Sequence, residues 1–210
     1  EDYYEYNLSR RKEIREKLLL ATEHILFCYS GSLNPWQCVD ETINLCKMIS
    51  DRFPLARFLF LTNDQENMRN RLSQCGLHKS KSLVKRCAPY EVRSYLQAAD
   101  VGIILRRDSV VNTVASPIKV AEYLASGLPV LISPNVGDYS DLIEKERCGL
   151  IIGLEQYDII INFLQHNSRE DLRSRAISTA NRYCRWESWH LSIANLFGLQ
   201  CKEERRASPD

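Results

Sequence analysis

The sequence lacks the patterns that mark several common classes of protein. No apolar run approaches the roughly 18 residues of a membrane-spanning helix, so we expect no membrane span. The polar start EDYYEYNLSRRK does not have the pattern of a signal peptide. The eight cysteines include no CxxC pair, and Cys28, Cys46 and Cys148 stand inside apolar patterns typical of a core. We therefore expect neither a metal site nor a disulfide framework, and a location in the reducing cytoplasm.

Charge excess and nucleotide fingerprints are missing as well. The 28 basic and 27 acidic residues give a net charge of +1, which favours neither nucleic acid nor anionic lipid as a partner. No GxGxxG follows the first apolar run and no GxxxxGK[ST] occurs, which argues against a dinucleotide dehydrogenase and a P-loop NTPase. Ser30 and Ser32 lack the GxSxG context of a hydrolase nucleophile. The histidines do not cluster with carboxylates, so we predict no catalytic base among them: His24, His78, His166 and His190.

The 210 residues instead show short apolar runs that alternate with helical patterns. Buried strands are predicted at residues 24–29, 57–61, 82–85, 100–105, 130–132 and 148–152. Helices are predicted at residues 8–20, 34–53, 64–75, 89–99, 116–126, 138–145, 155–165, 168–183 and 185–199, with a long polar loop at 106–115. This order predicts an α/β protein with a doubly wound, parallel, six-stranded, Rossmann-like sheet.

The same reading divides the chain into four parts. Residues 1–22 are expected to form a linker and a first helix, and residues 23–184 the Rossmann-like domain. A closing helix at 185–199 and a disordered tail at 200–210 would follow.

The most informative stretch is residues 116–130, SPIKVAEYLASGLPV. Ser116 is predicted to cap a helix whose first residue is Pro117, and Gly127 and Pro129 to end it. The positions predicted to face the core are Pro117, Ile118, Ala121, Leu124 and Ala125. Apolar runs on both sides make this a βαβ unit, with the start of the helix at the sheet edge where ligands bind.

Lys119 stands in the first turn of this helix, where the helix dipole disfavours a cation. A phosphate bound at the free N–H groups would reverse that effect and make Lys119 favourable. Glu122 lies on the same face and leans toward the helix start, within reach of a sugar hydroxyl next to that phosphate. The alternative is a solvated Lys119–Glu122 pair without a ligand, and these residues alone leave both open.

Polar and basic residues follow the predicted strands at the same edge of the sheet. They are Gly31, Ser32, Thr62, Asn63, Arg86, Cys87, Arg106, Arg107 and the loops at 116–119 and 133–138. Three or four cations and a helix start suit an anionic ligand such as a nucleotide diphosphate. Gly31 would let the backbone approach a phosphate closely, although an ordinary strand-to-helix turn explains it equally well.

SPIKVAEYLASGLPV, together with YSGSLNPWQ and AADVGIIL, resembles the C-terminal, donor-binding domain of GT-B glycosyltransferases. The closest group is family 4, the retaining enzymes that use nucleotide sugars, and its subgroup with a Pro-x-Lys-x-x-Glu-Tyr helix. The resemblance runs from about residue 8 to 199 and includes Trp186-Glu187, which is similar to the family's closing Trp-Glu helix. It implies that the Rossmann-like domain binds a nucleotide-sugar donor, with no metal and no further cofactor.

The resemblance also implies roles for individual residues. Glu122 matches the second Glu of the family's Glu-x7-Glu motif, which binds the ribose hydroxyls. Ser116, Pro117 and Ile118 match the turn whose amides hold the pyrophosphate, and Gly31 and Ser32 match the first loop beside the phosphates. Arg86 and Cys87 match the segment whose main chain contacts the base. Lys119 and Glu122 are the two residues to which we assign catalytic roles.

The sequence departs from the family at three positions. The first Glu of the motif is replaced by Val114, and the Arg and Lys of the first loop by Ser32 and Gln37. These changes remove a contact to the donor sugar and two phosphate-binding cations. Lys119, with Arg106 or Arg107, is our hypothesis for the replacement.

The family further implies an N-terminal acceptor domain, which this sequence does not show. We therefore expect a fragment or subunit of an enzyme that transfers sugar to a glycan or lipid-linked acceptor, in surface polysaccharide synthesis. Membrane contact would come only through the other half. Two alternatives stay open: a nucleotide-sugar epimerase of the same fold, and a degenerate module without catalysis. Such a module would bind a nucleotide sugar or a protein, in the latter case through Trp186, Trp189 and Phe197.

Overall fold

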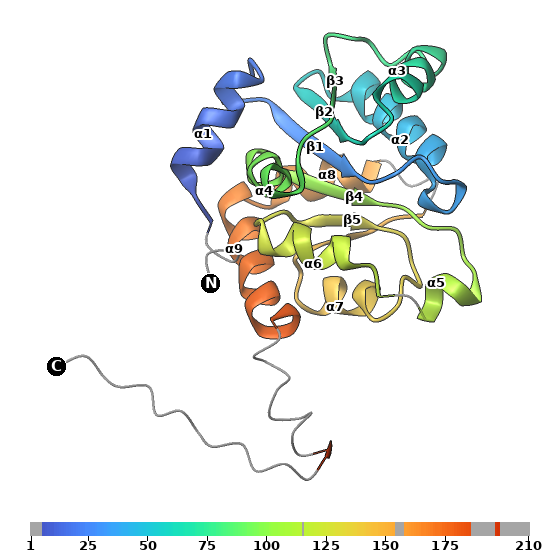
Figure 1. Ribbon diagram of the computed structural model, residues 1–210. Helices are drawn as coiled ribbons and strands as arrows, with labels where there is room; N and C mark the ends of the chain where they lie inside the picture. Colours follow the sequence, from blue (N-terminus) through green and yellow to red (C-terminus); the bar gives the residue numbers. More distant parts are fainter. Residues whose placement is uncertain (1–5, 115, 154–157, 186–195, 198–210) are drawn as a thin grey trace, which may run out of the picture.

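The structure is a computed structural model that describes residues 6–114, 116–153, 158–185 and 196–197. Its centre is one six-stranded parallel sheet with the strand order β3-β2-β1-β4-β5-β6 (Figure 1). The strands are β1 (Ile25–Ser30), β2 (Ala56–Leu61), β3 (Ser82–Lys85), β4 (Val101–Ile104), β5 (Val130–Ile132) and β6 (Gly149–Ile151). The predicted doubly wound sheet is confirmed, and its order reverses between β1 and β4.

Helices cover both faces of the sheet. They are α1 (Leu8–Lys17), the 3-10 turn η2 (Pro35–Gln37), α2 (Val39–Arg52), α3 (Gln65–Gln74), α4 (Pro89–Ala98), α5 (Val110–Val114), α6 (Ile118–Ala125), α7 (Tyr139–Lys145), α8 (Asp158–His166), α9 (Arg169–Thr179) and the π-helical turn η3 (Ala180–Cys184). None of the helices in the described part of the chain is long and apolar enough to cross a membrane.

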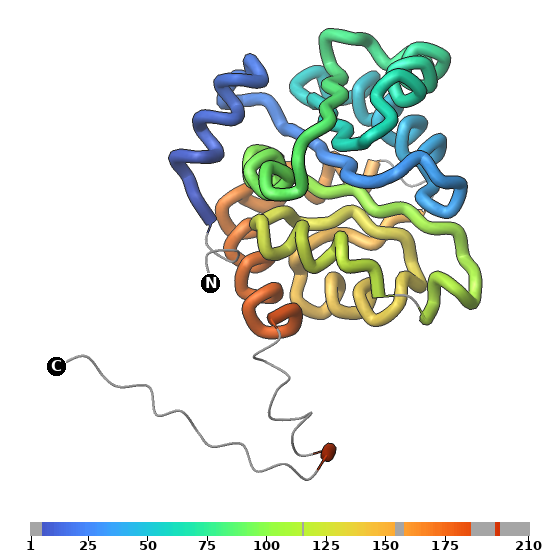
Figure 2. The backbone as a smooth tube through the Cα atoms, viewed as in Figure 1, coloured from blue at the N-terminus to red at the C-terminus, as the bar shows by residue number. Residues whose placement is uncertain are grey.

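Alternate residues of the strands enter two separate cores, because successive side chains of a strand point to opposite faces. Leu26 and Cys28 of β1 pack in one core with residues of α4, α6 and α9. Phe27 and Tyr29 pack in the other with residues of α2, α3 and α8. Figure 2 shows α6 running beside α9 on the first face. Cys28, Cys46 and Cys148 are buried, as predicted.

The structure differs from the sequence prediction in residues 106–115, which contain the short helix α5. The Ser109 hydroxyl accepts from the Asn112 N–H (3.2 Å), and the Ser109 carbonyl from the Thr113 N–H (3.0 Å). None of the residues of α5 is buried, and its five residues are too few for an apolar period to indicate a helix in the sequence. The predicted loop was therefore wrong in this part.

Helix boundaries account for the other differences. The helix predicted from residue 34 is divided at Cys38, which has a left-handed φ of 49°. Ser168 caps α9, but the helix predicted to residue 183 changes to a π-helical turn after Thr179. Much of the predicted helix 185–199, the start of the predicted helix 155–165 and the tail 200–210 lie outside the described residues.

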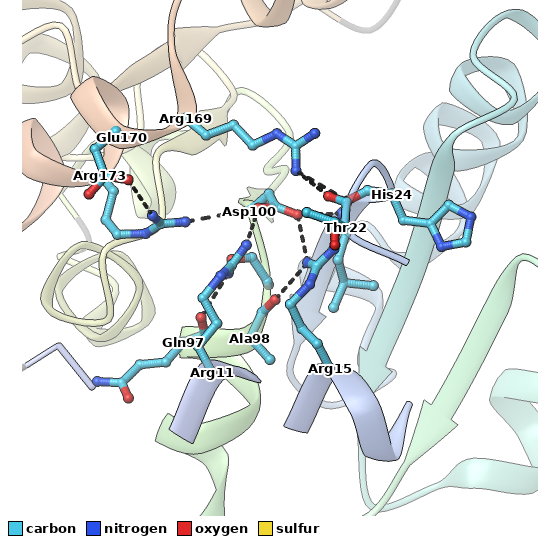
Figure 3. A network of polar contacts seen from close by, with 12 residues as sticks. Arg11, Arg15, Thr22, His24, Gln97, Ala98, Asp100, Arg169, Glu170 and Arg173 are labelled. Carbon is cyan, nitrogen blue, oxygen red and sulfur yellow. Dashed lines mark hydrogen bonds and ion pairs between the residues drawn. The ribbon is translucent and has the colours of Figure 1, made fainter. Parts of the chain in front are cut away.

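A buried ionic cluster fixes α1 to the amino end of β4 (Figure 3). Asp100, 7 % exposed, accepts hydrogen bonds from Arg11, from Arg15 (3.0 Å) and from the Leu26 N–H (2.8 Å). A guanidinium nitrogen of Arg173 lies 4.0 Å away. Arg11 and Arg15 also donate to carbonyl oxygens at the end of α4, where the helix dipole favours cations. The buried face of α1 is therefore largely cationic, with Arg11 and Arg15 on either side of Ile14.

Candidate functional site

A cavity of about 640 Å³ opens at the carboxyl ends of β1, β2 and β3. It lies beside the point where the strand order reverses, the usual ligand position in open α/β sheets. Its lining comes from the ends of β1 and β2, from the loops after the three strands and from helices α3, α4 and α6: Ser30, Gly31, Ser32, Leu33, Asn34, Leu61, Thr62, Asn63, Asp64, Asn67, Cys87, Pro89, Val92 and Lys119. Hydroxyl and amide groups stand beside apolar side chains, a combination suited to a sugar or a nucleoside.

The loop after β1 borders this cavity and is hydrogen-bonded to two tyrosines. The Tyr123 hydroxyl accepts from the Ser30 N–H (2.7 Å), and the Tyr29 hydroxyl donates to the Ser32 carbonyl (2.6 Å). Gly31 stands between them, and a Cβ added there would lie 2.9 Å from the Tyr29 hydroxyl oxygen. The outer end of the Tyr29 ring thus leaves little room for a side chain at position 31, a reason for glycine that the sequence did not reveal.

Helix α6 begins one residue later than predicted. Its N-cap is Pro117, and no side chain caps it, so the prediction of Ser116 as the N-cap was wrong. Ile118 is 69 % exposed instead of facing the core. The buried residues of α6 are Val120, Tyr123, Leu124 and Ala125. The large ring of Tyr123 decides this orientation, because it fills the space above Gly102 of β4. Gly127, with a φ of 76°, follows the end of the helix as predicted.

Lys119 and Glu122 form an ion pair at the cavity. Their Nζ–Oε2 distance is 2.7 Å, and their side chains are 34 % and 22 % exposed. Lys119 lines the cavity, and Glu122, its hydrogen-bond partner, stands outside the lining. The pair fits both interpretations left open by the sequence, a solvated pair and a pair at a phosphate.

The two arginines after β4 are directed elsewhere. Arg107 bonds Glu41 through two guanidinium nitrogens (3.0 and 2.7 Å), and this bond raises its pKa. Arg106 donates to the Leu105 carbonyl (2.7 Å), and burial lowers its pKa. Neither lines the cavity, so of the proposed replacement cations only Lys119 is in place.

The structure brings together part of the predicted set. Gly31, Ser32, Cys87 and Lys119 line the cavity, and Gln37 stands next to Gly31. The predicted residues outside the lining are Gln37, Arg86, Arg106, Ser116, Pro117, Ile118 and Glu122. Burial raises the pKa of the Cys87 thiol, which favours its neutral form at the cavity.

Sequence reasoning missed the side chains that α3 and α4 contribute: Asp64, Asn67, Pro89 and Val92. Asp64 was predicted only as the start of a helix, and its side chain caps α3 by accepting from the Asn67 N–H (3.2 Å). The available signal was its position directly after the carboxyl end of β2. No group of three or more His, Cys, Asp or Glu side chains in the described residues is arranged to hold a metal ion.

A family model described as "Glycosyl transferases group 1" matches residues 10–180. The chain belongs to this family. The match includes the sheet, the cavity and helix α6. Among curated proteins, none matches the sequence.

Several solved structures share the fold of this group 1 member. WaaG, "a glycosyltransferase involved in lipopolysaccharide biosynthesis", has a TM-score of 0.67 at 19 % identity over 95 % of this chain and 53 % of WaaG. Anabaena HepE in complex with UDP and glucose has a TM-score of 0.72 at 16 % identity over 94 % of this chain and 54 % of HepE. The C-terminal domain of Francisella tularensis LpcC, a "Glycosyl Transferase Group 1 Family Protein", has a TM-score of 0.66 at 12 % identity over 88 % of this chain and 97 % of that domain.

These likenesses show the fold, a Rossmann-like half of the GT-B architecture. The chain spans about half the length of WaaG and HepE. The LpcC domain, by contrast, is covered almost completely.

Proposed function

We propose that this chain is the donor-binding domain of a retaining glycosyltransferase that uses a nucleoside-diphosphate sugar. The observation that carries the proposal is the cavity at the ends of β1–β3, bounded by the Gly31 loop and by Lys119 of α6, in a group 1 family member. HepE, a protein of similar fold, has been crystallised in complex with UDP and glucose, which supports this class of ligand.

In this proposal the diphosphate lies between the loop after β1 and the start of α6. The N–H groups of Ser32 and of the first residues of α6 donate to it, and Lys119 neutralises its charge. Glu122 uses Oε1, the oxygen not bonded to Lys119, to accept from a ribose hydroxyl. The main chain near Cys87 contacts the base.

Catalysis would then consist of positioning the donor and stabilising the leaving diphosphate. Lys119 supplies the cation, and its bond to Glu122 fixes the ammonium group before the charge develops. The acceptor, a glycan or a lipid-linked sugar, would bind with the other half of a two-domain enzyme in surface polysaccharide synthesis.

A degenerate binding module is the second candidate, and one observation favours it. The described lining contains a single cation, Lys119, and also a carboxylate, Asp64, whereas a diphosphate favours several cations. The epimerase receives no such support, because no histidine stands among the described lining residues.

The experiment is a thermal-shift panel with UDP, GDP, ADP, CMP and their sugars. A site with a dissociation constant near 100 μM stabilises the fold by roughly 1.4–2.7 kcal/mol at ten- to hundredfold excess, which shifts the midpoint by several degrees. We expect one nucleotide to do so, and Glu122→Gln to reduce the shift. Unchanged shifts in EDTA would support a metal-free site. If no nucleotide shifts the midpoint, the donor-domain proposal fails.

A further inference from the structure

The loop that follows β1 is held on both sides of Gly31 by tyrosine hydroxyls from different elements. Tyr123 belongs to α6 and accepts from the Ser30 N–H at 2.7 Å. Tyr29 belongs to β1 and donates to the Ser32 carbonyl at 2.6 Å. The segment between these two bonds, residues 30–32, borders the cavity, as do the next two residues of the loop, Leu33 and Asn34.

The Tyr123 hydroxyl takes the place of a missing backbone acceptor for the Ser30 N–H. Pairing between β1 and β4 ends at Cys28 and Gly102, two residues before Ser30. On the other side the ladder continues, because the Gly31 N–H donates to the Leu61 carbonyl (3.0 Å). The buried Ser30 N–H would therefore lack an acceptor without the Tyr123 hydroxyl, and an unsatisfied buried donor is costly.

Neither tyrosine is placed to touch a ligand itself. Tyr123 is completely buried and Tyr29 is 3 % exposed. Burial raises the pKa of both hydroxyls, that of Tyr29 to about 12, so both are protonated at neutral pH. Ser32, by contrast, is exposed and lines the cavity, and its N–H has no hydrogen-bond partner among the described residues.

We propose that Tyr123 and Tyr29 are positioning residues for the diphosphate, which fix the Ser32 N–H relative to Lys119. Because Tyr123 lies on the same helix as Lys119, its hydroxyl ties one phosphate-binding element directly to the other. The proposal rests on the donor-binding function proposed above. It adds two residues that hold the loop and touch no substrate.

The test compares Tyr123→Phe and Tyr29→Phe with wild type. Tyr183→Phe is the matched control, because the Tyr183 hydroxyl donates to Glu146 (2.8 Å) in a part of the fold away from the cavity. Dissociation constants are measured for UDP and uridine and for GDP and guanosine by NMR titration. Amide hydrogen exchange of Ser30 and Ser32 is measured on the same samples.

We expect each cavity variant to bind its nucleoside diphosphate about three- to tenfold more weakly, as the loss of one hydrogen bond predicts. Affinity for the nucleoside without phosphates should change less than twofold. Exchange at Ser30 should accelerate in Tyr123→Phe alone, and Tyr183→Phe should match wild type throughout.

Equal weakening for the diphosphate and the nucleoside would show a merely structural role and overturn the proposal. Unchanged diphosphate affinity in both variants would overturn it while leaving the donor-binding function intact. If Tyr123→Phe does not fold, Tyr29→Phe alone decides, because it removes a bond to the loop without leaving a buried N–H unpaired. A wild-type chain that binds neither UDP nor GDP would overturn the proposed function, and the inference with it.

Discussion

Gly102 of β4 and Tyr123 of α6 fit together so closely that no side chain at position 102 can be accommodated. A Cβ added to Gly102 would lie 2.3 Å from the Cδ2 atom of the Tyr123 ring and 2.8 Å from its Cε2 atom. Real atoms do not approach so closely, so the ring or the strand would have to move. The absence of a side chain in β4 thus determines where the Tyr123 hydroxyl lies.

Gly102→Ala should therefore affect both stability and ligand binding. We expect a loss of about 1–3 kcal/mol in the free energy of unfolding, which is the usual cost of overpacking a core. Displacement of Tyr123 should also weaken UDP or GDP binding. Chemical denaturation and NMR titration measure the two effects.

A double-mutant cycle with Tyr123→Ala provides the control for Gly102→Ala. Alanine at 123 removes the Cγ, Cδ2 and Cε2 atoms that the new methyl group meets, so alanine at 102 should cost less in that background. Equal costs of Gly102→Ala in both backgrounds would contradict the assigned contact.

Lys119→Ala should weaken nucleotide binding far more than it weakens the fold. A charged hydrogen bond to phosphate is worth about 1.5–3 kcal/mol, which corresponds to roughly ten- to 150-fold in affinity. The ion pair with Glu122 is partly exposed, so its loss should change the free energy of unfolding by less than about 1 kcal/mol. Calorimetric titration measures the nucleotide affinity, and chemical denaturation measures the free energy of unfolding.

Two variants serve as controls for Lys119. Lys17→Ala removes a similar pair, with Glu13 at 2.6 Å on α1. Arg107→Ala removes a cation that Glu41 holds outside the cavity lining. Both should leave nucleotide affinity within about twofold of wild type. Equal affinity in Lys119→Ala and wild type would remove Lys119 from the site.

Local signals allowed most of the fold to be predicted. Strand β3 and strand β5 begin and end at the predicted residues. In α2 the buried residues Val39, Ile43, Cys46 and Ile49 recur at helical spacing, which marks the helix in the sequence. These features depend on neighbours a few residues apart, and sequence periodicity reports such neighbours directly.

The parts that could not be predicted depend on contacts between distant residues. Tyr123 meets Ser30 across 93 positions, and Arg11 meets Asp100 across 89. Sequence periodicity treated Tyr123 as one member of a motif and gave Arg11 no partner, because it holds no information on which elements pack together. Lys119 was found because it stands in the motif at the start of α6. Asn67 was missed because only the packing of α3 beside the sheet brings it to the cavity.

Asp100→Asn should destabilise the fold strongly. The carboxylate is the anionic partner of Arg11 and Arg15, and its removal leaves buried guanidinium groups without compensating charge. Breaking a buried pair in this way costs about 3–5 kcal/mol. Urea denaturation measures the loss. Asp51→Asn, which removes an exposed pair with Lys47, should cost less than about 1 kcal/mol. A similar small cost for Asp100→Asn would show that the cluster contributes little.

Tyr29 should make the fold sensitive to alkaline pH. Its pKa is about 12 in the folded chain, raised by burial, against the ordinary value of 10.0. Between these values the unfolded tyrosine has lost its proton while the folded one keeps it, so the unfolded state binds fewer protons. The free energy of unfolding therefore falls as the pH rises from 10 to 12, and the contribution is fully present only below pH 10.

Tyr29→Phe should remove this part of the pH dependence. We expect the unfolding free energy of the variant to fall less steeply between pH 10 and 12, by up to about 3 kcal/mol over the whole interval. Tyr90→Phe, at a side chain that is 84 % exposed, removes a tyrosine without removing a buried one and should keep the wild-type slope. If the unfolding free energy fell equally steeply with pH in wild type, Tyr29→Phe and Tyr90→Phe, Tyr29 would ionise equally in the folded and unfolded states. The hydroxyl would then not be held at the Ser32 carbonyl, because a phenolate cannot donate that bond.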